Sequence, residues 1–564
     1  MYLPANALGG ASKKNEKVDI LSFFGYDQRD KIDDRQLSEM YNMSSDSVPC
    51  LTPRKPRQHV ASVSNITAVA LPEYEKGKLS SFTGVAGGYF YYKGNAVTNI
   101  KLTSGEKSIV DFNGNICIFP DKVYYRYLPE PDTGQVYGSL RNMGKSVSLS
   151  GVKFYSSYNE ISGAYTAYIQ KSGADFDDYF EAGDSVVISG CSNQQNNTVV
   201  IDSKKEYASE TAIVSMVVDE VTETKLNLVM HTKTGEYGLF KNATEAGEVK
   251  IEIHIPDISC ACVHNNRLFG ASADGEHIYA SKLGDCFNFN SFQGLSDDSW
   301  YSEIGTPGEF TGIVSYRTAV VAFKRNYIHH IYGDSPLNFS IPKQTLSGAV
   351  DGKSIAEVGG VLYYMAADGF YEYSGGEPEK ISYPIRKVYK TCKSGTDGQR
   401  YYACASDDKG NSELLVYTPE YNLWHKEDDT AFVDFVRHEE FLYGVTRSEM
   451  FRFGAEDSDE VISWCVVSKK FTLDDFDFKG ANAIYIRLEA EDETQVKVYH
   501  AADDDDFELW GEISGKGFMV HKIPVRFEKC DSFRIMLEGT GKATVHDIEI
   551  ITYTGGRTNV KHIR

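Results

Sequence analysis

Residues 354–375 read SIAEVGGVLYYMAADGFYEYSG, and this stretch carries the pattern that decides the fold. Two runs rich in aromatic residues, 362–364 and 370–373, flank the pair Asp368-Gly369. An Asp-Gly pair between such runs is a strong signal for a β-hairpin. Aromatic and β-branched side chains pack well on a pleated surface, and no helical spacing is present, so we expect strands here.

The same pattern recurs four more times, starting at Cys260, Gly312, Gln399 and Phe432. The start-to-start spacings of the five copies are 52, 42, 45 and 33 residues, near the roughly 40 to 50 residues of a four-stranded propeller blade. A single blade cannot bury both faces of its sheet and must stack on neighbours around an axis. The repeats therefore predict a β-propeller.

Further strand patterns lie on both sides of these repeats. Residues 66–127 contain hairpin turns at 93–95 and 113–115 and fit an opening blade, which brings the expected number of blades to about six. Residues 136–249 have longer, more polar strands, as expected for an inserted small β-barrel domain. From residue 461 onward seven strands follow at short spacing, with Ile484, Ile486 and Leu488 alternating with polar residues, which predicts a β-sandwich.

The predicted fold is all-β, and the chain divides into five parts. They are an N-terminal docking arm at 1–57, the first propeller blade or blades at 58–135, the inserted β-barrel at 136–249, the remaining blades at 250–460 and the C-terminal β-sandwich at 461–564. Within the arm, Asp34 to Tyr41 predicts one helix of about two turns, capped by Asp33 or Asp34.

The bulk composition describes a folded protein of 564 residues with 37 Tyr, 30 Phe and a net charge of −22. That charge argues against a surface that grips nucleic acid, which needs clustered Lys and Arg. It is compatible with a channel whose acidic wall does not hold DNA, and equally with a surface charge that only keeps the protein soluble. No run approaches 18 apolar residues, so we expect neither a membrane-spanning segment nor an N-terminal signal peptide.

The ten cysteines are scattered, and only Cys260 and Cys262 are close in sequence. Their i, i+2 spacing on a strand places them on one face and does not form a zinc knuckle. We expect all ten to be reduced thiols, most of them small core residues, in a protein made in a reducing cytosol.

The N-terminal segment carries a family resemblance. Its elements are Gly25, Arg29-Asp30, the short segment 37–41 followed by Asn42-Met43, and the ending PCLTPR at 49–54. Together with the propeller pattern, these elements resemble the tail nozzle or packaged-DNA stabilisation proteins of short-tailed bacteriophages. The passage FEAGDSVVISGCSNQQNNTVVIDS from Phe180 likewise resembles small β-barrel modules of phage tail and adaptor proteins. A capped helix leading into an unrelated β-domain remains the alternative for the first match.

The resemblance implies a structural virion protein of the phage tail, synthesised in the host cytoplasm. Such a head-tail connector or nozzle forms a homo-oligomeric ring, with six copies as the size the resemblance suggests. The ring would contact other tail, adaptor or portal proteins, extend the DNA channel, and retain the genome or conduct it during ejection without specific binding. Two alternatives stay open: a receptor-binding or tail-tip adhesion protein that recognises host surface glycans, and a propeller glycoside hydrolase.

No catalytic motif, phosphate loop or paired metal ligand is recognisable, so we expect no enzyme activity, no catalytic, cofactor-binding or metal-binding residue, and no cofactor. Four weaker signals are present in the sequence. The stretch SADGEHIY from Ser272 is close to the Asp-box turn of sialidases but reads more simply as an Asp-Gly hairpin. The run Asp503 to Asp506 suits a cation or, more simply, a solvated loop tip. His329 and His330 alternate across a strand and cannot face one metal, and Trp424 with His425 reads as a core aromatic beside an exposed histidine.

Overall fold

A computed structural model describes the chain from residue 14 to residue 555 with several gaps. The described residues are 14–75, 78–129, 134, 138–199, 212–342, 344–456, 458, 460–473, 476–491, 494–525 and 530–555. Within them the protein is built of β-strands, with three short 3-10 turns and no α-helix. The all-β prediction is confirmed.

Seven four-stranded antiparallel sheets form the propeller, and the first three lie in the earlier part of the chain. Blade 1 consists of β6 (Ile66–Glu75), β7 (Lys78–Ala86), β8 (Tyr89–Tyr92) and β9 (Asn95–Val97). Blade 2 consists of β10 (Ser108–Phe112), β11 (Asn115–Phe119), β12 (Val123–Arg126) and β13 (Leu140–Asn142). Blade 3 consists of β20 (Ile258–His264), β21 (Arg267–Ser272), β22 (His277–Ala280) and β23 (Trp300–Glu303).

The remaining four blades coincide with the repeats that start at Gly312, Ser354, Gln399 and Phe432. Blade 4 consists of β24 (Phe310–Tyr316), β25 (Ala319–Lys324), β26 (Tyr327–Tyr332) and β27 (Gln344–Leu346). Blade 5 follows the turn η3 (Gly352–Ser354) and consists of β28 (Ala356–Val358), β29 (Val361–Ala366), β30 (Gly369–Tyr373) and β31 (Glu379–Lys380). Blade 6 consists of β32 (Thr391–Thr396), β33 (Tyr401–Ser406), β34 (Ser412–Thr418) and β35 (Leu423–Lys426). Blade 7 consists of β36 (Asp434–His438), β37 (Phe441–Val445), β38 (Glu449–Arg452) and β5 (Gln58–Ser62).

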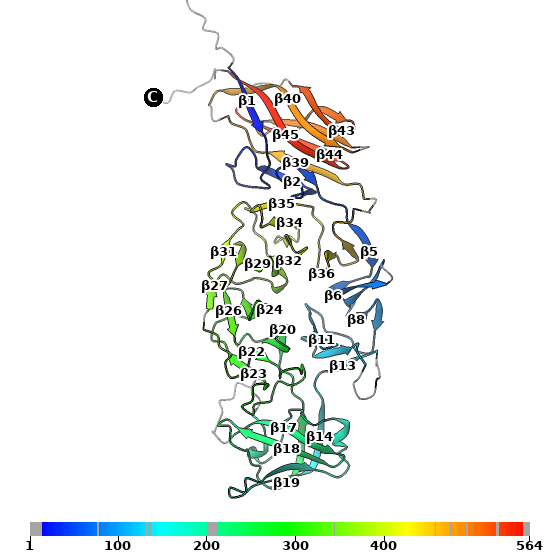
Figure 1. Cartoon of the computed structure of the whole chain (residues 1–564), viewed down its shortest axis with the longest axis vertical. Coiled ribbons are helices and arrows are strands. Elements are labelled where there is room, and N and C mark those ends of the chain that lie inside the picture. The colour runs from blue at the N-terminus through cyan, green and yellow to red at the C-terminus, as the bar shows by residue number, and fades with distance from the viewer. Residues whose placement is uncertain are drawn as a thin grey trace, which may run out of the picture.

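The fourth strand of blade 7 comes from the other end of the propeller sequence. β5 precedes blade 1 in the chain, yet it pairs antiparallel with β38 of the last blade. The innermost strands of most successive blades contact one another, β24 of blade 4 contacts the turn η3 that leads into blade 5, and β36 of blade 7 contacts β6 of blade 1. The propeller is therefore a closed ring of seven sheets within the described residues, sealed by a strand from its own N-terminal side (Figure 1).

The structure has one blade more than the six or so expected, because residues 66–127 contain parts of two blades. The hairpin at 93–95 joins β8 to β9 in blade 1, whereas the hairpin at 113–115 joins β10 to β11 in blade 2. The outer strand β13 of blade 2 lies beyond residue 135, inside the range assigned to the inserted domain. The Asp368-Gly369 hairpin forms as predicted, with Met365 opposite Phe370 and Tyr364 opposite Tyr371.

The inserted domain lies between blades 2 and 3 and is one six-stranded sheet in the order β16-β19-β14-β15-β18-β17. Its strands are β14 (Ser146–Tyr158), β15 (Tyr165–Gln170), β16 (Val187–Ser189), β17 (Ile213–Thr222), β18 (Lys225–Thr232) and β19 (Ala243–Glu252), with turns η1 (Phe176–Asp178) and η2 (Gln194–Asn196). A bridge between Ser185 and Val217 joins the region before β16 to β17. The sheet thus nearly closes on itself, as the predicted small barrel requires.

Two facing sheets form the C-terminal sandwich, and the seven strands expected after residue 461 are all present. They are β39 (Ser463–Ser468), β40 (Phe478–Ala490), β41 (Gln495–Ala502), β42 (Glu508–Ser514), β43 (Gly517–Pro524), β44 (Phe533–Thr540) and β45 (Ala543–Gly555). The sheet orders are β1-β45-β40-β43 and β2-β39-β44-β41-β42. Ile484, Ile486 and Leu488 are buried, as their alternation predicted.

The sandwich also takes strands from the N-terminal segment, and this corrects two expectations. Residues 14–57 are not a free docking arm: β1 (Lys14–Ile20) pairs with β45, β2 (Leu37–Tyr41) pairs with β39, and β3 (Met43–Ser44) pairs with β4 (Thr52–Pro53). The expected helix from Asp34 to Tyr41 is wrong, because this stretch contains strand β2. Residues 1–13 of the expected arm lie outside the described residues.

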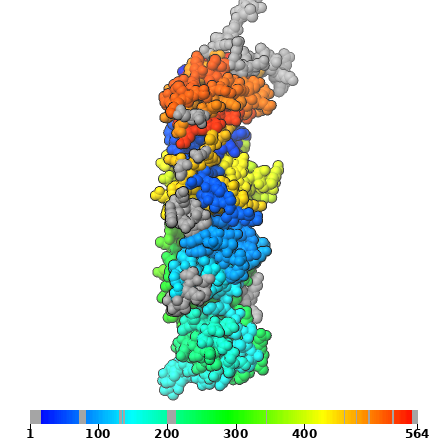
Figure 2. All heavy atoms as spheres, turned by 90° about the vertical axis from the view of Figure 1, so that its right-hand side faces the viewer, coloured from blue at the N-terminus to red at the C-terminus, as the bar shows by residue number. Residues whose placement is uncertain are grey.

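The three bodies stack in line, with the sandwich at one end, the propeller in the middle and the inserted barrel at the other end (Figures 1 and 2). One apolar core runs from blades 5 and 6 through the N-terminal residues Phe23, Tyr26 and Met40 into the sandwich. A second core runs from blades 2 and 3 into the inserted barrel. Both junctions are therefore packed interiors rather than linkers.

Candidate functional site

A cavity of about 430 Å³ lies on the propeller axis, where the innermost strands converge. It is lined from most of the blades, for example by Val69 of β6, Ser108 of β10, Ala261 of β20 and Ile313 of β24. We call it the axial cavity. A concave space with several polar groups facing it is the default location to consider for a ligand site.

Charged side chains at this cavity join blades that are not neighbours, and three of them, Glu106, Lys353 and Asp434, line it. Lys393 of blade 6 forms an ion pair with Glu106, which immediately precedes blade 2, and its Nζ also lies 2.8 Å from Asp351 Oδ2. Lys353 Nζ, before blade 5, lies 2.8 Å from Asp434 Oδ2 of blade 7. The axis is thus bridged by a network of three carboxylates and two ammonium groups.

Backbone groups fix two of these carboxylates in place. Asp434 Oδ2 accepts a hydrogen bond from the Val69 N–H at 3.0 Å, and Asp351 Oδ1 accepts one from the Lys353 N–H at 2.9 Å. Burial raises the pKa of Asp351, and the neighbouring Lys393 only partly offsets this. Burial alone would lower the pKa of Lys393, but Asp351 and Glu106 raise it overall.

This arrangement permits two kinds of behaviour. A carboxyl group with a raised pKa beside other carboxylates is the pattern of acid and base groups in glycoside hydrolysis. Because these carboxylates are paired with lysines, they also form ion pairs that connect blades on opposite sides of the axis.

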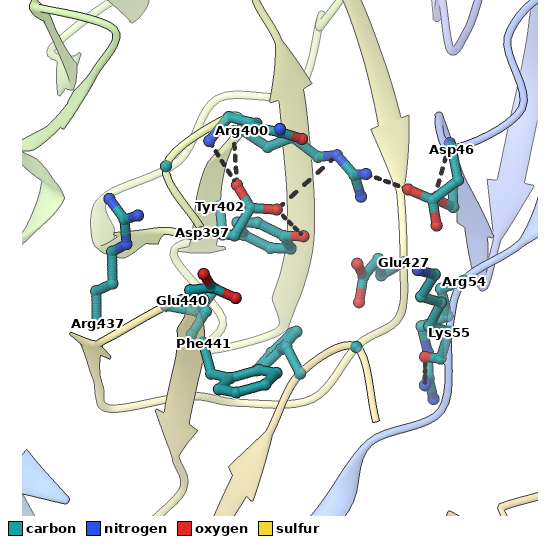
Figure 3. A pocket seen from close by; sticks show the side chains of 16 residues that line it. Asp46, Arg54, Lys55, Asp397, Arg400, Tyr402, Glu427, Arg437, Glu440 and Phe441 are labelled. Atoms are coloured by element: carbon teal, nitrogen blue, oxygen red, sulfur yellow. Dashed lines mark hydrogen bonds and ion pairs between the residues drawn. The ribbon is translucent and has the colours of Figure 1, made fainter. Parts of the chain in front are cut away.

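A second cavity, of about 550 Å³, lies between blades 6 and 7 and the N-terminal segment (Figure 3). We call it the seam pocket. Asp46 of the N-terminal segment forms an ion pair with Arg400 of the propeller. Across the pocket, the Asp397 carboxylate accepts hydrogen bonds from the Arg400 N–H at 2.8 Å and the Tyr402 hydroxyl at 3.1 Å. Side chains of both signs therefore face this space.

The seam pocket continues into a buried ion-pair cluster that joins the N-terminal segment to the propeller. Arg57 lies 2.5 Å from Glu427 and 2.6 Å from Asp428, all three being almost completely buried. Arg54 lies 2.7 Å from Glu460. Burial alone would lower the pKa of Arg57, but Glu427 and Asp428 raise it above its ordinary value. The seam is a structural joint between distant parts of the chain.

The histidines noted in the sequence are packing residues, with one correction. His329 and His330 are both buried; His329 Nε2 lies 2.8 Å from Thr306 Oγ1, and His330 Nδ1 lies 2.8 Å from the Tyr332 hydroxyl. Trp424 is a core residue that donates from Nε1 to the Ile381 carbonyl at 3.0 Å. His425 is not exposed as expected: it is 1% exposed, because β35 lies between β34 and the N-terminal segment.

The aspartate run belongs to a turn. Asp503 Oδ1 accepts hydrogen bonds from the backbone N–H groups of Asp531 and Ser532, each at 2.9 Å, and Asp504 lies 2.7 Å from Lys470 Nζ. This fits the loop-tip alternative. All ten cysteines are free thiols in the structure. Among the described residues, no helix is long and apolar enough to cross a membrane.

Sequence reasoning named no site residue and missed the axial network. Glu106, Asp351, Lys393 and Asp434 lie in four separate parts of the chain, so no local motif connects them. The available signal was positional: all four lie in or just before the first strand of a blade, and that strand is the one nearest the axis.

No protein-family model matches the sequence, and no curated protein is significantly similar to it. Solved structures with some likeness include an exo-β-1,3-galactanase from Phanerochaete chrysosporium, at 11% identity over 50% of this chain and 92% of that chain, with a TM-score of 0.19. A chain of a mitotic checkpoint complex matches at 7% identity over 61% of this chain and 88% of that chain, TM-score 0.24. A glycoside hydrolase family 43 arabinoxylan arabinofuranohydrolase from Bacillus subtilis matches at 9% identity over 74% and 94%, TM-score 0.16.

At these TM-scores the likenesses assign no activity to this chain, but they remove the ground for one expectation. We expected the chain not to be an enzyme. Two of the three similar structures just named are glycan-hydrolysing enzymes, so that expectation is withdrawn.

Proposed function

We propose that the chain is a rigid structural unit of a phage tail, resembling a ring-forming nozzle or adaptor that extends the DNA channel. The observation that carries this proposal is the continuity of the apolar cores across both junctions, from the sandwich to the propeller and from the propeller to the inserted barrel. A rod with a different β-domain at each end suits a subunit that contacts different neighbours at its two ends. The sequence resemblance around Gly25 and Asn42-Met43 supplies the phage context.

In such a ring the DNA channel would lie between copies of the chain and not along the propeller axis. The axis is bridged by the Glu106–Lys393 and Lys353–Asp434 ion pairs. Closure into a ring requires heterologous contacts, in which two different surfaces of each copy meet. The net charge of −22 favours a channel wall that does not hold phosphate.

The test is the oligomeric state of the purified, tag-free chain, measured by mass photometry and by negative-stain microscopy over a range of concentrations. We expect closed rings of one size, alone or after addition of the proteins encoded beside it. A chain that stays monomeric under every one of these conditions would refute the proposal.

A second candidate function, glycan hydrolysis at the axial cavity, is favoured by the raised pKa of Asp351, which lies near Glu106, while Glu106 and Asp434 line the cavity. In this reaction Asp351 would protonate the leaving oxygen and Asp434 would act as the second carboxylate. Lys393 and Lys353 would have to move away from these carboxylates when the sugar binds.

This candidate is tested by incubating the chain with a panel of cell-surface polysaccharides and measuring released sugars. Activity that falls at least 100-fold in both Asp351→Asn and Asp434→Asn would support it. Asp368→Asn is the matched control, because Asp368 lies in an exposed turn and pairs with Lys380. No sugar release by the unaltered chain on any substrate would eliminate the candidate.

A further inference from the structure

The hairpin turn between β21 and β22 gathers three metal-ligating side chains outside both cavities. Asp274, Glu276 and His277 each present one ligand atom, and these atoms all lie within 4.8 Å of one another. Ligand atoms bound tetrahedrally to a divalent metal at about 2.0–2.2 Å lie roughly 3.4 Å apart, so binding would draw these atoms closer together. Asp274 and Glu276 are exposed, so their side chains have room to rotate toward a bound ion.

His277 is the second and independent observation that points to a ligand. His277 is only 6% exposed, and its Nδ1 has no hydrogen-bond partner within the described part of the chain. A buried ring nitrogen without a partner costs free energy, because its desolvation is not repaid by a hydrogen bond. The ring is held by stacking on Tyr279, with centroids 5.8 Å apart. A cation coordinated through Nδ1 would give this nitrogen a partner.

The turn is held in one conformation by contacts that do not use the ligand atom of His277. Ser272 Oγ accepts hydrogen bonds from the N–H groups of Glu276 at 3.1 Å and His277 at 2.9 Å. Gly275 has φ +77°, and a Cβ at this position would lie 2.3 Å from the Gly308 carbonyl oxygen. The backbone that leads into blade 4 therefore packs directly against the turn. Lys324 Nζ donates to the Gly275 carbonyl at 2.6 Å.

The two carboxylates of the turn attract a cation. The buried Lys324 ammonium, which donates to the Gly275 and Thr306 carbonyls, interacts with both carboxylates and offsets part of their charge. Imidazole with carboxylates is a donor set for first-row transition metals, whereas calcium and magnesium prefer oxygen ligands alone. Both carboxylates are exposed, so water can complete the coordination shell.

We propose that Asp274, Glu276 and His277 form a binding site for a first-row divalent metal such as Zn²⁺. The ion would cross-link the β21–β22 turn of blade 3. This site is independent of the proposed function, since its residues contribute to neither the axial cavity nor the seam pocket.

The test is isothermal titration of the full tag-free chain with Zn²⁺, with Ca²⁺ as the comparison ion. We expect one Zn²⁺ equivalent that is lost, or weakened at least tenfold, in both Asp274→Asn and His277→Gln, and no comparable binding of Ca²⁺. His59→Gln is the matched control: it removes an exposed imidazole that also lies near a carboxylate, Glu449 at 3.9 Å, and should leave the Zn²⁺ affinity unchanged.

Circular dichroism of the metal-free variants establishes that each is folded. If His277→Gln does not fold, Asp274→Asn decides alone, because its side chain is exposed. Absence of Zn²⁺ binding in the unaltered chain, unchanged affinity in the Asp274 variant, or an equal loss in His59→Gln would overturn the proposal.

Discussion

Arg57 is the residue on which the seam between the N-terminal segment and the propeller depends. It is paired with two buried carboxylates, Glu427 and Asp428, and lies over the Phe453 ring at 4.7 Å. Arg57→Met would leave both carboxylates buried without their cation, a change that typically costs about 3–5 kcal/mol. We expect a fall of that size in the free energy of unfolding, measured by urea denaturation.

Lys55→Met provides the matched control for Arg57. Lys55 pairs with Glu456 at 2.8 Å, but both side chains are largely exposed, and such pairs contribute about 0–1 kcal/mol. Equal unfolding midpoints for the two variants would show that burial of the Arg57 cluster has no energetic consequence.

His425 makes the stability of blade 6 sensitive to acid. Burial lowers its pKa to about 3, whereas an unfolded histidine titrates near 6.5. The unfolded state therefore binds more protons between these values, and stability falls as pH drops through that window, by about 1.4 kcal/mol per pH unit. His425→Leu should remove this contribution. Calorimetry between pH 7 and 4 should show a shallower loss of melting temperature in the variant; an identical slope would contradict this.

At the scale of elements, the strand β5 decides whether the propeller is closed. β5 supplies the fourth strand of blade 7, with Ala61 opposite Met450 and His59 opposite Phe451. Truncation through Ser62 also removes β1, β2 and the Arg57 cluster. We expect this truncation to expose the β38 edge, to increase hydrogen exchange in β36–β38 and to lower the unfolding midpoint. Truncation of residues 1–13, which removes no described strand, is the control.

The result distinguishes a structural role for residues 14–62 from a role confined to docking. A truncated chain with native exchange rates in β36–β38 would mean that blade 7 does not need its fourth strand.

The missed strand β2 has a specific physical cause. Leu37 and Met40 are both buried while Glu39 and Tyr41 are exposed. This i, i+3 spacing is typical of a helix and does not fit a regular strand. The structure has a register shift between Leu37 and Glu39 opposite β39. A bulge of this kind adds one residue and breaks the period of two, so the pattern imitates a helix.

At the scale of the whole molecule, the continuous cores predict a single rigid particle. Phe23 and Tyr26 pack in the core shared with the sandwich, and Phe119 and Tyr279 in the core shared with the inserted barrel. We expect small-angle X-ray scattering of the monomeric form to fit this one arrangement of the three bodies. A curve that requires an ensemble of bent conformations would show that the junctions act as hinges, and would weaken the proposed structural function.

Local sequence patterns determined the strands, the hairpins and the existence of three β-domains. The turn Asp368-Gly369, the five aromatic repeats and the alternation at Ile484, Ile486 and Leu488 all depend on residues close together in the chain, where side-chain period and turn chemistry are readable. The tertiary structure alone decided the closure of the ring by β5, the strands that the N-terminal segment adds to the sandwich, and the ion pairs across the axis. Backbone hydrogen bonds between distant strands do not depend on residue type, so the sequence does not reveal which strands pair. Glu106 contacts Lys393 only because the closed ring brings two separate blades to one axis.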